Sequence, residues 1–163
     1  ELLIDPACSI VFEMQPAEAD VMKRPPRPSA ARLVDRGVLF IAFAQGLSVL
    51  VATFVALLAA HRLGHGEGGM RALAFATLIG GNLALIHVNR TWSAPSAERT
   101  SRVVWLVTAL GTAALGAVLF VPVLGRALHF AAVPWWAAIA AFALGALSVA
   151  WFEVKKRMRA PAR

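Results

Sequence analysis

The stretch GVLFIAFAQGLSVLVATFVALLAA, residues 37–60, decides the fold, because it runs for twenty-four residues without Asp, Glu, Lys or Arg. A helix rises about 1.5 Å per residue, so about 20 apolar residues cross the hydrocarbon core of a bilayer. In lipid, a single segment satisfies all its backbone hydrogen bonds only as a helix. The stretch therefore predicts a transmembrane helix.

Three further stretches, 72–89, 103–125 and 127–152, also lack these four residue types. With their ends adjusted, the predicted spans are about 37–60, 70–89, 102–121 and 134–153. A fifth apolar stretch, 1–15, is too short to cross alone, and we expect it to be the C-terminal half of a membrane helix in a longer protein. The predicted fold class is all-α: a polytopic membrane helical bundle with one partial helix and four transmembrane helices.

Composition and charge support this prediction and orient it. Hydrophobic residues make up 59% and charged residues 15%, whereas soluble domains carry about a quarter charged residues. Thirteen Lys and Arg residues fall in the Pro-rich loop 16–36, the loop after the second span and the tail 154–163, against three in the alternate loops. The positive-inside rule places the richer side, including the C-terminus, in the cytoplasm. Residues 37–153 then form a four-helix support domain of an integral membrane protein.

Two carboxylates in the first apolar stretch are candidates for cation binding. Glu1 and Asp5 are four residues apart and share a helix face. Ionisable groups in membrane segments are costly and commonly functional. Pro6 frees backbone carbonyls near Asp5, which favours a site for a hard cation. The alternative is that Glu1 lies in a loop and Asp5 at a helix end.

The other polar residues have simpler interpretations. Asn82 follows Gly80 and Gly81 in the middle of a span, and it is either an oxygen ligand or a partner in an interhelical hydrogen bond. Gln45 and Ser48 are isolated polar residues that are expected to be packed, and Cys8 is expected to be a small buried hydrophobe, the alternative being that it lines the ion path. Small residues four apart predict close helix packing at Ala109/Ala113, Ala141/Gly145 and Gly80/Ala84.

Two strings at the start of the chain carry a family resemblance. ELLIDPACS, residues 1–9, and FEMQPAEADVMKRPPR, residues 12–27, resemble the C-terminal part of P-type cation-transporting ATPases such as the calcium and sodium/potassium pumps. In these pumps the sixth membrane helix carries an Asp followed by Gly or Pro. It leads to a cytoplasmic Asp-(Ile/Val/Leu)-Met-x-Arg-Pro-Pro-Arg string, which here is 20–27. Four more helices follow, as counted here, and 71–90 resembles the eighth.

The resemblance implies roles for three residues as metal ligands. Asp5 matches the ion-binding Asp of the sixth helix, Glu1 the ligand one turn earlier, and Asn82 a position of the eighth helix that holds Glu or Gln in some pumps. Calcium is one candidate ion. Ile4 and Pro6 argue against it, because calcium pumps often have Thr and Gly there.

The sequence also lacks what an ATPase needs. The Asp-Lys-Thr-Gly phosphorylation string and a nucleotide domain are missing, so this chain should not hydrolyse ATP alone. We expect it to need no cofactor of its own. Mg-ATP would bind only to the missing domains. We predict a C-terminal transport-domain fragment of a cation pump in a bacterial plasma membrane. Its partners are lipid and the rest of the pump, helices one to six and the cytoplasmic domains, with no nucleic acid. The alternative is an independent four-span scaffold or regulatory protein.

Overall fold

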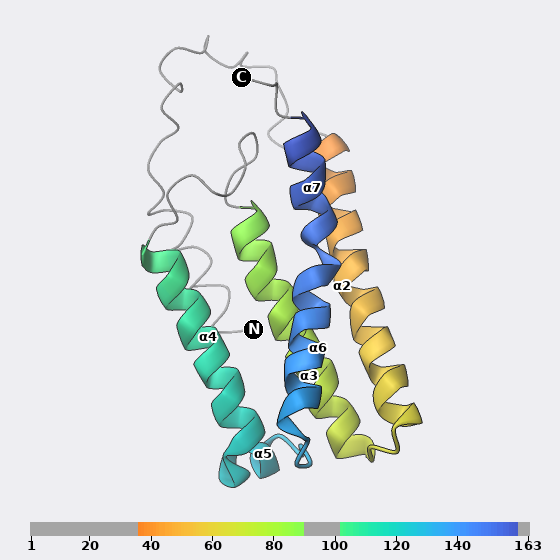
Figure 1. Ribbon diagram of the computed structural model, residues 1–163, viewed down its shortest axis with the longest axis vertical. Coiled ribbons are helices and arrows are strands. Elements are labelled where there is room, and N and C mark those ends of the chain that lie inside the picture. Colours follow the sequence, from red (N-terminus) through yellow and green to blue (C-terminus); the bar gives the residue numbers. More distant parts are fainter. Residues whose placement is uncertain (1–35, 90–101, 160–163) are drawn as a thin grey trace.

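The structure is a computed structural model that describes residues 36–89 and 102–159, and every regular element in these residues is a helix (Figure 1). The helices are α2 (Arg36–Arg62), α3 (Glu67–Asn89), α4 (Arg102–Phe120), α5 (Pro122–Ala127), α6 (Trp135–Ser148) and α7 (Ala150–Arg159). Four segments are long and apolar enough to cross a membrane: α2, α3, α4 and the α6–α7 segment 135–155. The predicted all-α membrane fold is confirmed. The predicted partial helix, 1–15, lies outside the described residues.

The spans run alternately up and down, and α3 lies at the centre. In Figure 1, α2 starts and α3 ends at the top, α4 descends from the upper half, and α6 and α7 return upward. Helix α3 contacts α2, α4, α6 and α7. The turns between α2 and α3 and between α4 and α6 lie together at the bottom of the bundle.

A glycine ends α2 and allows the tight reversal into α3. Gly64 has φ +77°, a conformation that side chains disfavour. Its N–H donates to the His61 carbonyl over 3.1 Å, and the His65 N–H donates to the Ala60 carbonyl over 3.0 Å. These two bonds form a Schellman motif, which satisfies carbonyls left open at the helix end. The sequence HRLGHGEGG therefore gives a helix end and a short loop.

The last span, predicted as 134–153, is one membrane-spanning segment, 135–155, built from two consecutive helices. Helix α6 ends at Ser148 and α7 begins at Ala150, with the buried Val149 between them. The Ser148 hydroxyl donates to the Gly145 carbonyl over 2.7 Å, a local bond that competes with the regular helical pattern. The short helix α5, with Pro122 in its first turn, was also not predicted.

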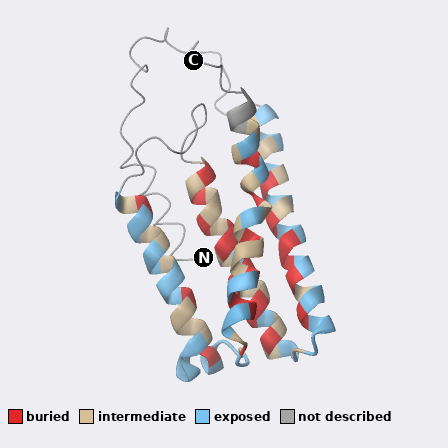
Figure 2. Ribbon diagram, in the orientation of Figure 1, coloured by how far each residue is buried: buried red, intermediate tan, exposed pale blue. Residues whose placement is uncertain are grey.

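Small residues bring α3 and α6 close together. A Cβ atom at Gly80 would overlap the Phe142 carbonyl, and one at Gly145 would overlap the Thr77 carbonyl. Ala72, Ala76 and Ala141 are buried in the same core (Figure 2). Because lipid is as apolar as a helix surface, close backbone approach of this kind is what holds membrane helices together.

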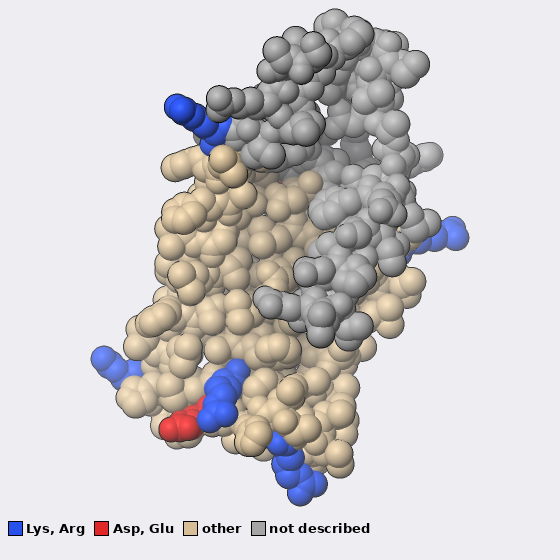
Figure 3. All heavy atoms as spheres, turned by 180° about the vertical axis from the view of Figure 1, so that it is seen from behind, with Lys and Arg blue, Asp and Glu red and all other residues tan. Residues whose placement is uncertain are grey.

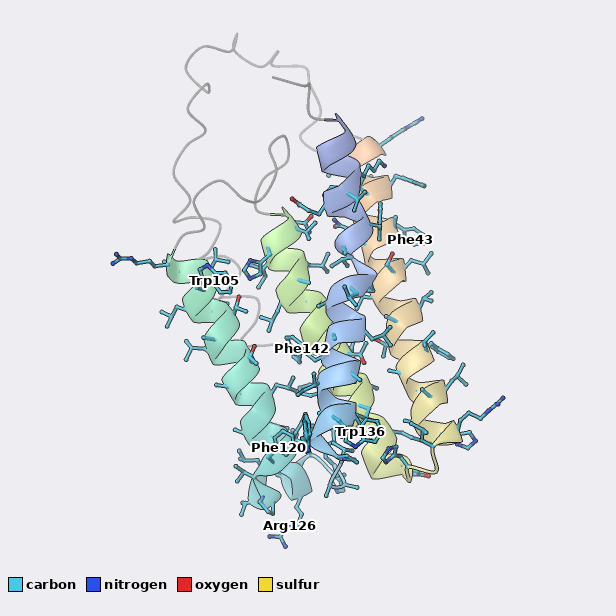
Figure 4. The ribbon with its side chains drawn as sticks, in the orientation of Figure 1. Phe43, Trp105, Phe120, Arg126, Trp136 and Phe142 are labelled. Carbon is cyan, nitrogen blue, oxygen red and sulfur yellow. The ribbon has the colours of Figure 1, made fainter. Side chains whose placement is uncertain are left out.

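Helix α4 is different, because most of its surface is exposed. Only 11% of its span is buried, against 56% for α3. Ala109 and Ala113, predicted to support packing, are exposed on the described structure. Figure 3 shows the Lys, Arg and Glu side chains near helix ends and an uncharged surface between them. Apolar residues such as Phe43, 69% exposed, point away from the bundle (Figure 4). This surface suits lipid contact.

Candidate functional site

Asn82 is the predicted cation ligand that falls in the described residues, whereas Glu1 and Asp5 lie outside them. It is half-buried on α3, one helical turn after the exposed Leu78. Within 36–89 and 102–159, its side-chain amide has no hydrogen-bond partner, whereas the nearby Thr77 hydroxyl donates to the Leu73 carbonyl over 2.9 Å. The structure therefore does not place Asn82 in an interhelical hydrogen bond of the described bundle.

The position of Asn82 follows from how α3 is surrounded. Gly80 faces α6 at Phe142, and Gly81 faces α2 at Val49. Leu83 packs toward α4, in a cluster with Val104. Successive helical residues are about 100° apart, so Asn82 lies about 200° from Gly80. It therefore occupies the face of α3 that α2, α4 and α6 leave least covered.

Gln45 and Asn89 form a reciprocal amide pair between α2 and α3. The Gln45 Nε2 donates to Asn89 Oδ1 over 2.9 Å, and Asn89 Nδ2 donates to Gln45 Oε1 over 3.1 Å. Gln45 is 4% exposed, so it depends on this partner for its hydrogen bonds. Sequence reasoning treated Gln45 as isolated and did not single out Asn89. The signal was the amide in an apolar span, which needs a partner.

A second polar contact joins α2 to α7. The Trp151 Nε1–H donates to Ser48 Oγ over 3.1 Å, and Ser48 Oγ in turn donates to the Ala44 carbonyl over 2.8 Å. The Lys155 ammonium lies 6.0 Å from the centre of the Trp151 ring, within reach of a cation–π interaction. Trp151 therefore links α7 to α2 through its indole N–H.

A third polar contact joins α3 to α4. His87 Nε2 lies 2.8 Å from Thr108 Oγ1. The Thr108 hydroxyl also lies 2.8 Å from the Val104 carbonyl of its own helix. The centres of the His87 and Trp105 rings lie 5.5 Å apart, and Figure 4 labels Trp105 on α4. These contacts lie toward the end of the bundle where α2 begins.

The described residues do not assemble a metal site by themselves. Residues 36–89 and 102–159 contain no group of three or more His, Cys, Asp or Glu side chains that could hold an ion. Glu67 is exposed and pairs with Arg71 over 3.1 Å within α3. A cation site that includes Asn82 would need ligands from outside the described residues.

The comparison with protein families agrees with the fold. A family model described as the C-terminus of cation transporting ATPases matches residues 1–158, nearly the whole chain. A search of curated proteins found no match to this chain. With four apolar helices of membrane-spanning length, the match makes this an integral membrane protein. The chain belongs to the family formed by the C-terminal membrane region of cation-transporting P-type ATPases.

Proposed function

We propose that this region supplies part of the intramembrane cation site of an ATP-driven pump, together with the helices that support the site. The observation that carries the proposal is Asn82, whose amide has no hydrogen-bond partner in the described residues and lies on the least covered face of the central helix α3. An amide in a membrane segment is costly without a partner. A cation shared with other pump helices would be such a partner.

Glu1 and Asp5 would supply the remaining ligands of this chain. Carboxylate and amide oxygens suit hard cations such as calcium. Ile4 and Pro6 count against calcium, so the proposal is an oxygen-liganded cation of unspecified identity.

The other helices would act as a support for the site. Small residues hold α3 to α6 at Gly80 and Gly145, which gives α3 a fixed place. The remainder of the pump would provide the phosphorylated Asp, the nucleotide site and the other membrane helices. Coupling would then follow from differential cation affinity between the conformations of the whole pump.

Ion-stimulated ATP hydrolysis by the intact pump in membrane vesicles tests the proposal. Asp5→Asn, Glu1→Gln and Asn82→Ala should each raise the half-saturating cation concentration, by about tenfold for Asn82→Ala, the equivalent of about 1.4 kcal/mol. Thr112→Val is the control, because Thr112 is exposed on α4 and donates to the Thr108 carbonyl of its own helix. Vesicles should first be screened with Ca²⁺, Mn²⁺, Na⁺ and K⁺.

The result that contradicts the proposal is an unchanged ion dependence in all three variants. The independent scaffold predicts that outcome, and it also predicts that the chain inserts and persists in the membrane without the rest of a pump.

A further inference from the structure

We infer that Gln45 and Asn89 are positioning residues: their amide pair fixes the register of α3 against α2 and thereby the place of Asn82. The inference rests on the proposed function of Asn82. Its first step, the control of register, concerns only the described helices.

The pair has the properties of a register lock. Both amides donate and accept within the pair, over 2.9 and 3.1 Å, so a shift of either helix along its axis breaks two bonds together. Gln45 is 4% exposed and Asn89 is half-buried, so water has little access to the Gln45 amide. In an apolar environment the two separated amides would each lose a partner.

The remaining contacts between α2 and α3 include an apolar cluster that joins Val49 of α2 to Val88 of α3. Gly81 lies against Val49, and small buried residues such as Ala52, Ala56 and Ala60 line α2. Close packing of this kind stabilises the helix pair through van der Waals contact. The amide bonds add a directional contact, which a change of register would break.

The link to Asn82 is geometric. Asn82 and Asn89 are seven residues apart on α3, close to two helical turns, so they lie on one face. A rotation or slip of α3 that moves Asn89 away from Gln45 moves Asn82 by a similar amount. Holding Asn89 therefore holds the proposed ligand.

Disulfide formation between α2 and α3 reports the register directly. A Cβ atom at Gly81 would lie 2.9 Å from Val49 Cγ1, so the sulfur of a cysteine at 49 falls within bonding reach of a cysteine at 81. The parent for the test is the intact pump with Val49→Cys, Gly81→Cys and Cys8→Ala, in membrane vesicles. The measurement is the rate of cross-linking under mild oxidation.

The conservative change Gln45→Asn shortens one partner, and Gln45→Leu removes it. Both should slow cross-linking, by about threefold to about tenfold, the range expected for interhelical hydrogen bonds in membranes. The double variant Gln45→Asn/Asn89→Gln, called the exchange variant, keeps the combined length of the two side chains and should restore the rate of cross-linking. Ser48→Ala is the control, because it removes the bond from α2 to Trp151 and leaves α3 untouched.

Two results would overturn the register lock: an unchanged rate in Gln45→Asn and Gln45→Leu, or an exchange variant as slow as Gln45→Asn alone. If Gln45→Leu fails to accumulate, the comparison of Gln45→Asn with the exchange variant still decides.

Ion-stimulated ATP hydrolysis, measured without the cysteine changes, then separates this inference from the proposed function. Gln45→Asn should raise the half-saturating cation concentration about threefold with little change in maximal rate, and the exchange should reverse this. A shift in Asn82→Ala without one in Gln45→Asn leaves the ligand role standing and overturns the positioning role. Slower cross-linking with no shift in Asn82→Ala supports the register lock and overturns its connection to a ligand.

Discussion

Gly145 permits the close contact between α3 and α6, because its side chain is only a hydrogen atom. A Cβ atom there would overlap the Thr77 carbonyl and lie 2.8 Å from the Gly81 nitrogen. Both obstacles are backbone atoms of α3, which cannot move aside as a flexible side chain can. The contact therefore requires glycine at this position.

Gly145→Ala should lower the free energy of unfolding by about 1–3 kcal/mol, the typical effect of overpacking a close contact. Gly46→Ala is the matched control, because a Cβ atom at Gly46 meets nothing within 4 Å on the surface of α2. The measurement is unfolding of the purified protein by a denaturing detergent. Equal stability of the two variants would contradict the close approach of α3 and α6.

At the scale of the helix, α3 and α4 differ in how much of their surface the bundle covers. Ala76 of α3 has no exposed surface and belongs to the core shared with α6. Ala113 of α4 is exposed. The same residue type therefore has a packing role on one helix and none on the described part of the other.

Ala76→Leu should destabilise the protein by about 1–3 kcal/mol through overpacking, whereas Ala113→Leu should leave stability within about 0.5 kcal/mol of the parent. Detergent unfolding of both variants, with their yields in the membrane fraction, measures the difference. Destabilisation by Ala113→Leu of a similar size would show that α4 buries this face in the whole protein.

The contrast between α3 and α4 shows that the sequence predicts where the membrane spans lie but not which of their residues pack. The absence of charge over 37–60 predicts a span because the bilayer thickness alone sets the required length. Whether a small residue such as Ala113 packs depends on which neighbour lies beside it, and that is a tertiary property. The break at Val149 lies beside a local hydroxyl bond from Ser148 to the Gly145 carbonyl, and hydropathy reports neither feature.

In the candidate site too, the sequence predicts which polar residues matter but not which partners they have. An amide in an apolar span, at Gln45 or Asn82, is visible in the sequence as a group that needs a partner. The partner is a matter of geometry: Gln45 meets Asn89 forty-four residues away, and Asn82 meets none in the described helices. Glu1 and Asp5 lie outside the described residues, so their role as ligands stays a prediction.

At the scale of the whole molecule, the helices fix which loops share a side of the membrane. The turn after α2 and the segment between α4 and α6 lie at one end of the bundle (Figure 1). Their flanks carry Arg62, Arg71 and Arg126, whereas the thirteen other basic residues fall in the segments that the sequence predicts to lie on the opposite side. Cytoplasmic loops of membrane proteins carry an excess of Lys and Arg, so the side that contains the C-terminus is predicted to be cytoplasmic.

Cysteine labelling of intact cells tests this orientation in a Cys8→Ala background. Gly66→Cys lies in the turn between α2 and α3, where a side chain meets nothing within 4 Å, so an impermeant maleimide should label it from outside. Ala162→Cys in the basic tail should react only after the cells are permeabilised. The reverse pattern would contradict the orientation while leaving the helix order intact.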